Sequence, residues 1–276
     1  MSIKYGFLGP VGTFTEAALQ KIASSDDQLI AYANVTAALD AVRKGDCQKA
    51  LVPIENSVEG VVARTLDELA SGEPLVITQE ITLPVSFALL TLPGTDPKDI
   101  KSIATHPHAE SQCRSFIAKN YPTAQIIETP STAAAAKGLA NKDYEAAIAG
   151  VNAAKNYNLK IITEDIGDNQ AAVTRFVVVE KPGRKVGATG KDRTSLAVFI
   201  AIDHAGALLE ILNEFAKHQV NLTFIQSRPT GSQLGHYHFI IDAEGHIEDV
   251  PISAALAGLK QICEDIRFLG SYPQAK

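Results

Sequence analysis

The chain has 276 residues, of which 46% are hydrophobic and 20% charged, and its formal net charge is −6. This length exceeds what one domain usually needs, and the composition is that of a globular protein with a full apolar core. The acidic balance argues against a nucleic-acid partner, because binding to phosphates requires a basic face. No stretch reaches the ~20 apolar residues that cross a bilayer, so no membrane partner is expected.

The cysteines and the N-terminal residues bear on the cellular compartment. Cys47, Cys113 and Cys263 are widely spaced and odd in number, which fits neither a disulfide framework nor a zinc site. The first residues, MSIKYGFLGP, lack the apolar core and cleavage site of a secretory signal. Both features indicate a cytoplasmic protein with reduced thiols.

The first part of the chain alternates short apolar strands with amphipathic helices. Strands are expected at residues 3–9 and 49–56, and helices at residues 13–23, 34–46 and 58–70. Thr13 or Thr15 stands where it can cap the first helix. Asn34 or Thr36 can cap the second, which stops at Gly45. This alternation predicts a parallel, doubly wound sheet.

From residue 73 the pattern changes to long β-rich runs, as it does when a chain crosses into a second lobe. The elements expected there are strands at 100–107, 124–131 and 144–150, helices at 109–120 and 132–141, and a polar bend and last strand within 159–180. Two similar α/β lobes with the chain crossing between them predict one bilobed domain over residues 1–182. Its second lobe is expected at about residues 78–165.

A glycine-rich, basic stretch then separates this domain from a second one. Residues 183–192 have no apolar periodicity and are predicted to be an exposed linker. Residues 193–276 follow a different order of elements, with strands at 193–203, 220–229, 234–245 and 266–272 and helices at 205–219 and 250–265. This βαββαβ order is the split-βαβ plan of a small α+β domain.

Polar clusters occur at strand-to-helix junctions of the first domain. Residues 9–15 place free backbone N–H groups and two hydroxyls at a helix start, which favours an anion, although taken alone they are better explained by a tight turn with a helix cap. Glu55, Asn56 and Ser57 come directly after a strand, and a helix cap would explain only one of these three residues. Since open α/β sheets bind ligands at the carboxyl ends of their strands, the clusters predict a polar binding site.

A third junction carries Thr105, His106, His108 and Gln112. The histidine pair could suggest a metal. Two histidines at i and i+2 in a loop are rarely ligands, however, and no Asp or Cys completes a set. No metal site is therefore predicted.

Arg175 interrupts the apolar run AAVTRFVVVE and needs a partner. An internal acid such as Glu55 would serve, and so would the carboxylate of a ligand, which a guanidinium can hold with two hydrogen bonds. The charges alone leave both partners open.

Taken together, these motifs resemble prephenate dehydratases. The matching segments, in order and spacing, are GFLGPVGTFTEAAL, LVPIENSVEGVV, HPHAESQC, STAAA and TRFVVV. The C-terminal segments GALLEIL and VNLTFIQSRP resemble the ACT regulatory domain of the same family. The resemblance covers nearly the whole chain, and no chorismate mutase part is expected before Met1.

The resemblance implies a fold and a reaction. The fold is α/β, a bilobed catalytic domain like periplasmic binding proteins with its site in the cleft, joined to an α+β ACT domain. The reaction is the decarboxylating dehydration of prephenate to phenylpyruvate in phenylalanine biosynthesis, with phenylalanine as the effector. Aromatisation drives it, so no cofactor and no metal are expected. Because ACT sheets pair edge to edge, a homodimer or homotetramer is implied.

The resemblance also implies roles for individual residues. Thr174 donates a hydrogen bond to the leaving hydroxyl, Glu55 or a water shares the proton, and Arg175 holds a carboxylate. The substrate-binding residues are Thr13, Asn56, Ser57, Thr105, Gln112 and Phe176. Phenylalanine is enclosed by Gly206, Ala207, Leu208, Asn221, Leu222, Gln226, Ser227, Arg228 and Pro229.

Two departures from the family pattern and two alternatives accompany this interpretation. Gln226 replaces the usual Glu of the ACT motif, and Ala171 and Ala172 stand where an Asn is usual. An arogenate dehydratase would act on a substrate that differs only in carrying an amine where prephenate carries a ketone. A protein that merely senses an amino acid would share both domain plans.

Overall fold

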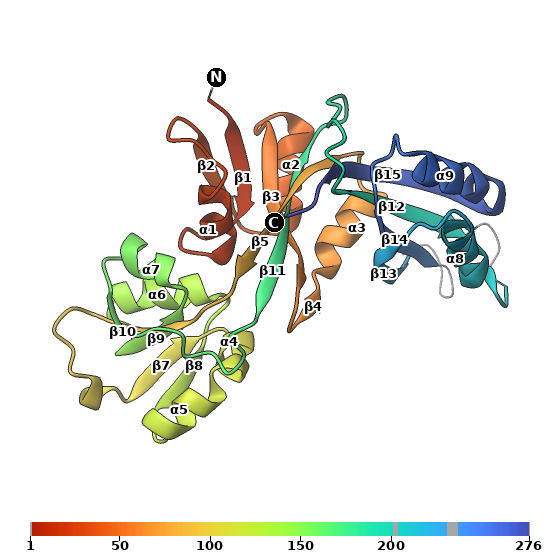
Figure 1. Ribbon diagram of the computed structural model, residues 1–276. Coiled ribbons are helices and arrows are strands. Elements are labelled where there is room, and N and C mark those ends of the chain that lie inside the picture. Colours follow the sequence, from red (N-terminus) through yellow and green to blue (C-terminus); the bar gives the residue numbers. More distant parts are fainter. Residues whose placement is uncertain (1, 201–203, 231–236, 276) are drawn as a thin grey trace. The chain divides into compact units, whose positions relative to one another are not determined.

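A computed structural model describes residues 2–200, 204–230 and 237–275 (Figure 1). The ends of two expected strands, at residues 201–203 and 234–236, lie outside this range. The first of two units contains Met1–Ala38, Leu51–Val62 and Thr82–Phe176, and the second contains Leu39–Ala50, Ala63–Ile81 and Val177–Lys276. None of the helices in the described segments is both long and apolar enough to cross a membrane.

The N-terminal sheet contains the strands expected near residues 3–9 and 49–56. Its strand order is β2 (Gln28–Tyr32), β1 (Lys4–Leu8), β3 (Lys49–Asn56), β11 (Val173–Glu180) and β5 (Val76–Pro84), with β4 (Gly60–Val61) beside β3. The helices that follow its strands are α1 (Phe14–Gln20), α2 (Val35–Lys44) and α3 (Ala63–Ser71).

Two of the predicted helix caps are confirmed. The backbone N–H of Glu16 donates to Thr13 Oγ1 at the start of α1. The backbone N–H of Ala37 donates to Asn34 Oδ1 over 2.8 Å at the start of α2. Gly45 follows α2 with φ 84°, a left-handed conformation that glycine adopts without strain.

The helix expected at residues 58–70 begins only at Ala63, so the first part of that prediction is wrong. Residues before it form a turn and the short strand β4, which pairs antiparallel with β3. The reason is the amide of Asn56, whose Oδ1 accepts the backbone N–H groups of Val58 and Glu59 over 2.8 and 2.9 Å. Such a side-chain-closed turn competes with helix formation.

The second lobe of the first unit has its own sheet, in the order β10 (Lys160–Thr163), β6 (Ala88–Thr91), β9 (Ala146–Ala149), β7 (Ser102–Thr105) and β8 (Gln125–Glu128). Successive residues of β6 enter different cores: Leu89 packs with residues of α4 (Pro107–Gln112) and α5 (Arg114–Asn120), and Leu90 with residues of α6 (Thr132–Ala140) and α7 (Val151–Asn156). Figure 1 shows these helix pairs on opposite faces of the sheet.

Three features of this lobe differ from the sequence prediction. The sheet is mixed, because β6 runs antiparallel to both β9 and β10. The helix expected at 109–120 breaks at Cys113, a fully buried residue whose φ is −119°. Helix α7 was not predicted, since its six residues are too few to show a period of 3.6.

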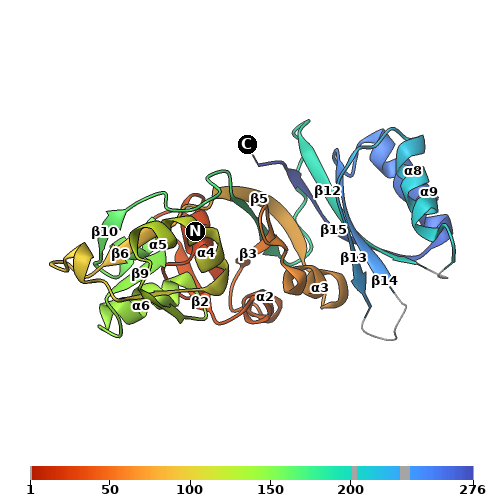
Figure 2. The same cartoon turned by 90° about the horizontal axis from the view of Figure 1, so that it is seen from below.

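The C-terminal domain confirms the βαββαβ plan. Its elements are β12 (Asp192–Ile200), α8 (Ala207–Lys217), β13 (Leu222–Pro229), β14 (Tyr237–Glu244), α9 (Val250–Ile262) and β15 (Cys263–Pro273). The antiparallel sheet has the order β13-β14-β12-β15. Both helices cover one face of it (Figure 2), where Phe215 and Leu259 join the core. On the other face, His238 stacks on Phe199 with ring centroids 5.0 Å apart.

Candidate active site

A cavity of about 570 Å³ lies within the first unit. Residues from α1, the β3–β4 turn, α4, α6 and β11 line it. The cavity wall includes five of the residues that the sequence singled out: Thr13, Asn56, Gln112, Thr174 and Phe176. Glu55, Ser57, Thr105 and Arg175 are not among its lining residues. The expected site thus divides into residues that face this cavity and residues that do not.

Asn56 and Thr174 meet at the cavity wall. Asn56 Nδ2 donates to Thr174 Oγ1 over 2.7 Å. The orientation of the amide is fixed, because Asn56 Oδ1 accepts the backbone N–H groups of Val58 and Glu59. A hydroxyl that accepts through one lone pair still has its own hydrogen to donate. Asn56 therefore leaves the hydroxyl hydrogen of Thr174 free for another acceptor.

Ser57 holds the strand of Thr174 beside the end of β3. The backbone N–H of Ser57 donates to the carbonyl of Val173 over 2.9 Å, and the backbone N–H of Val173 donates to Ser57 Oγ over the same distance. The contacts Ser57–Val173, Asn56–Thr174 and Glu55–Arg175 follow in opposite order along the two segments, as between antiparallel strands. The fully parallel sheet expected from the sequence is therefore wrong at this strand.

Arg175 pairs with the internal acid. Its Nη1 lies 3.5 Å from Glu55 Oε2, and the arginine side chain is only 9% exposed. Because side chains alternate along a strand, Arg175 points away from the face that carries Thr174 and Phe176. The structure thus places both charged residues beside the cavity wall and not among its lining residues.

The two other threonines have structural partners. Thr13 lines the cavity, but its hydroxyl donates to the carbonyl of Leu8 over 3.1 Å, so its hydrogen is already used. Thr105 is fully buried and donates to the carbonyl of Ile148 over 2.9 Å, which joins β7 to β9. Neither hydroxyl donates to a ligand in this conformation.

Residues of the two lobes also meet at the cavity. Gln112 Nε2 donates to Glu59 Oε1 over 3.1 Å, and His108 Nδ1 lies 3.4 Å from Glu59 Oε2. His106 caps α4 by accepting the backbone N–H of His108 at Nδ1. Burial, and then the neighbouring His108, lower the pKa of His106. The sequence offered no reason to select Glu59, which was expected at the start of a helix over residues 58–70, where an acid usually faces solvent.

A second cavity, of about 340 Å³, lies in the C-terminal domain. Gly206, Ala207, Leu208 and Ser227 line it, which brings together parts of both segments expected to enclose phenylalanine. The other residues of that set, Asn221, Leu222, Gln226, Arg228 and Pro229, do not line it.

Arg228 makes a different contact, on the opposite face of β13. Its Nε and Nη2 each donate to one carboxylate oxygen of Asp67 in α3, both over 2.8 Å. Nearby, Arg267 Nη1 donates to the carbonyl of Gly72 over 2.6 Å, just beyond the end of the same helix. The two arginines attach α3 to the sheet of the C-terminal domain within the second unit.

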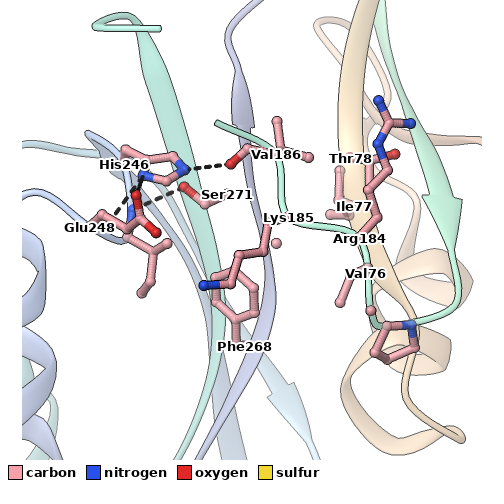
Figure 3. Close-up of a pocket in the computed structure, with 14 residues that line it drawn as sticks. Val76, Ile77, Thr78, Arg184, Lys185, Val186, His246, Glu248, Phe268 and Ser271 are labelled. Carbon is pink, nitrogen blue, oxygen red and sulfur yellow. Dashed lines mark hydrogen bonds and ion pairs between the residues drawn. The ribbon is translucent and has the colours of Figure 1, made fainter. Parts of the chain in front are cut away.

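A third cavity, of about 430 Å³, lies beside the linker in the second unit. Figure 3 shows His246 at its wall, between Val186 of the linker and Glu248. The imidazole Nε2 lies 3.0 Å from the carbonyl of Val186, and Nδ1 accepts the backbone N–H of Glu248 over 3.2 Å. An imidazole that accepts at Nδ1 can donate from Nε2, so the side chain of His246 joins the linker to the C-terminal domain.

Fold and cavities define a bilobed α/β protein with a C-terminal βαββαβ domain. A family model described as "Prephenate dehydratase" matches residues 5–184, and one described as "ACT domain" matches residues 194–261. The first match spans more than half of the chain. The chain belongs to the prephenate dehydratase family.

Relatives agree with this assignment. Prephenate dehydratase from Amycolatopsis methanolica is 42% identical over 273 residues, which cover 99% of this chain and 89% of the relative. The crystal structure of prephenate dehydratase from Arthrobacter aurescens, in complex with L-Phe, is 48% identical with a TM-score of 0.94 and covers 99% and 90% of the two chains. A structure described as a quorum quenching acylase, GqqA, is 27% identical with a TM-score of 0.87, covering 98% and 97%. Because one fold can host several activities, the function is argued from the site.

Proposed function

We propose that the chain converts prephenate to phenylpyruvate and that phenylalanine, bound in the C-terminal domain, regulates it. The observation that carries the catalytic part is the hydrogen bond from Asn56 to Thr174, which turns the hydroxyl hydrogen of Thr174 toward another acceptor. Thr174 is 8% exposed and lines the cavity, so this donor operates where water competes little.

The reaction matches such a donor. The bond from the ring to its carboxylate breaks as carbon dioxide leaves, and its electron pair completes the aromatic ring while the ring C–O bond breaks. The departing hydroxide takes a proton and becomes water. Donation from Thr174 to that oxygen strengthens as negative charge develops there, which stabilises the transition state more than the bound substrate. General acid assistance of this kind contributes about 10²–10⁴-fold in rate.

The apolar part of the cavity suits a six-membered carbon ring. Phe176 lies on the same strand face as Thr174, and Phe14 and Phe87 line the cavity with their rings edge to face, centroids 5.6 Å apart. These apolar side chains can bury the carbon ring of the substrate and place it beside the hydroxyl of Thr174.

The regulatory part rests on the 340 Å³ cavity. Gly206 precedes α8 with φ 98°, and the cavity beside it reaches Ser227 of β13. A helix start offers backbone N–H groups to the carboxylate of an amino acid. This arrangement, and the L-Phe complex of the Arthrobacter aurescens relative, support phenylalanine as the effector.

Three further assignments belong to the same proposal. The domain boundaries are residues 182 and 193, around a linker whose residues 187–191 are all exposed. The protein is a homodimer or homotetramer that forms through its C-terminal domains. It works in the cytoplasm, in keeping with three cysteines that are all free thiols.

The test is turnover by the purified chain. Prephenate should yield phenylpyruvate, and added phenylalanine should lower the rate. Arogenate, assayed in parallel, should yield less phenylalanine than prephenate yields phenylpyruvate. If neither prephenate nor arogenate gave a product, catalysis would be rejected and a protein that only binds an amino acid would remain.

A further inference from the structure

The active-site cavity contains few groups that can carry positive charge. Among the described residues that line it there is no Lys and no Arg, and only His106 and His108 can become positively charged. Prephenate carries two carboxylates. Its binding therefore depends on these imidazoles and on neutral donors such as the amide of Gln112.

The two histidines are not equivalent. His106 uses Nδ1 as an acceptor for the backbone N–H of His108, which requires a ring without a proton on that nitrogen. The side chain of His108 is 63% exposed, and its Nδ1 faces the carboxylate of Glu59. His108 is thus the imidazole that an incoming carboxylate can reach.

Glu59 occupies the place of such a carboxylate. One of its oxygens accepts from Gln112 Nε2 over 3.1 Å, and the other lies 3.4 Å from His108 Nδ1. The two donors come from one helix, α4, whereas Glu59 comes from the β3–β4 turn. An ion pair this exposed contributes little to stability, so a better-placed carboxylate can replace it.

We propose that Glu59 is an internal substitute for a carboxylate of the substrate: it holds His108 and Gln112 in the free enzyme, and the pyruvyl carboxylate of prephenate displaces it. His108 becomes a substrate-binding residue, and Glu59 a residue that sets affinity by competition. The inference rests on the proposed function, since it names the group that this same cavity binds.

The reaction decides which carboxylate binds there. The ring carboxylate leaves as carbon dioxide, and contacts that hold its charge would stabilise the bound substrate more than the transition state. The pyruvyl carboxylate keeps its charge in substrate, transition state and product. Contacts to it change the binding of all three equally, and so they alter KM and product affinity without altering kcat.

Steady-state kinetics of four variants test the proposal. Glu59→Gln keeps the size of the side chain and an acceptor for Gln112, but removes the competing charge. We expect KM for prephenate to fall roughly two- to fivefold, the range of one exposed ion pair, with kcat within about twofold of wild type. His108→Gln should raise KM by a similar factor, and His108→Lys, which retains a cation, should raise it less.

Product inhibition and a control on α4 complete the design. The inhibition constant of phenylpyruvate should change in the same ratio as KM in each variant. Glu110→Gln removes a charge from the same helix, next to Arg114 and outside the cavity lining, and should leave both constants unchanged. The proposal is overturned if Glu59→Gln leaves KM unchanged or raises it, or if product inhibition does not follow KM. Failure of wild type to convert prephenate would instead reject the function itself.

Discussion

Asn56 decides which way the hydroxyl of Thr174 points. Its side-chain amide makes three hydrogen bonds: Nδ2 donates to Thr174 Oγ1, and Oδ1 accepts the backbone N–H groups of Val58 and Glu59. The turn that replaced the expected helix prevents the amide from rotating. We therefore predict that this amide contributes to catalysis without contact with the leaving group.

Replacing that amide by a carboxylate of the same shape tests this role. Asn56→Asp retains the acceptor for the turn but cannot donate to Thr174 Oγ1. The hydroxyl would donate to the new carboxylate instead, so we expect kcat to fall at least about tenfold with prephenate, on the scale of a lost general-acid contact. The same substitution at Asn34, where an acceptor alone caps α2, should leave turnover and melting temperature near wild type. Equal kinetics of the two variants would contradict the role.

Thr174 itself should act mainly in the transition state. Thr174→Ala removes the donor, and we expect kcat to fall by about 10²–10⁴ with little change in KM. Thr174→Ser keeps the hydroxyl and the contact from Asn56, and should retain much of the activity. Stopped assays of phenylpyruvate formation measure kcat and KM of both variants. An alanine variant within a fewfold of wild type would rule out the assignment.

At the scale of elements, α3 stands out because arginines attach it to the sheet of the C-terminal domain at two points. Arg228 of β13 binds Asp67, and Arg267 of β15 binds the backbone carbonyl of Gly72. Arg228 is the neighbour of Ser227, which lines the cavity assigned to phenylalanine. Along the chain, α3 follows β4, which pairs with the residues around Asn56. We therefore predict that this helix transmits a change at the effector cavity to the turn at Asn56.

Weakening that attachment should weaken regulation. Asp67→Asn loses the charge and one of the two acceptors for Arg228. Saturating phenylalanine should then inhibit the variant less than wild type, although calorimetry still detects its binding. Glu110→Gln removes an acid that is paired with Arg114 and does not contact α3, and phenylalanine should inhibit this variant as it inhibits wild type. Unchanged inhibition of the Asp67 variant at saturation would assign the Asp67–Arg228 pair to stability alone.

Local elements followed from local sequence, and contacts between distant segments did not. The caps at Thr13 and Asn34 and the βαββαβ order were predictable, since caps and periodicity depend on neighbours in the chain. The break at Cys113 was not, because it depends on tertiary burial. The contact of Asn56 with Thr174 joins residues 118 positions apart. No spacing rule reaches that far, and only the resemblance to a family pointed to both residues.

The candidate site residues show the same division between what local sequence predicts and what depends on tertiary structure. Arg175 and Glu55 carry charges that looked suited to a ligand, yet strand alternation turns them from the cavity. Alternation itself was predictable, but which face is hollow depends on how the two lobes of the first unit close on each other. Glu59 was not predicted as a site residue because its partners, His108 and Gln112, belong to the other lobe.

For the whole molecule, acid should reduce stability through His238. This buried side chain has no hydrogen-bond partner for either ring nitrogen among the described residues. Burial lowers its pKa from the ordinary 6.5, Asp67 opposes the shift, and Arg228 and Arg267 add to it. Below about pH 6.5, His238 therefore binds a proton in the unfolded chain but not in the folded chain. Stability from this group is complete above that pH and is lost as the pH falls.

A substitution that cannot titrate isolates this contribution. His238→Phe keeps a ring against Phe199 and removes the proton site. Melting temperatures at pH 7.5 and 5.5 should then differ less for the variant than for wild type. An equal difference in the two proteins would show that the acid sensitivity arises elsewhere.

The position of β11 has a consequence for synthesis. In the strand order it lies between β3 and β5, although it leaves the ribosome after all other strands of that sheet. Until residues 173–180 emerge, the sheet has a gap at its centre, and closing such a gap requires contacts over long stretches of chain, which form slowly. The same strand delivers Thr174. A nascent or truncated chain that ends before it has neither a continuous sheet nor the hydroxyl proposed to act in catalysis, so we expect catalysis to begin only when this strand has joined the sheet.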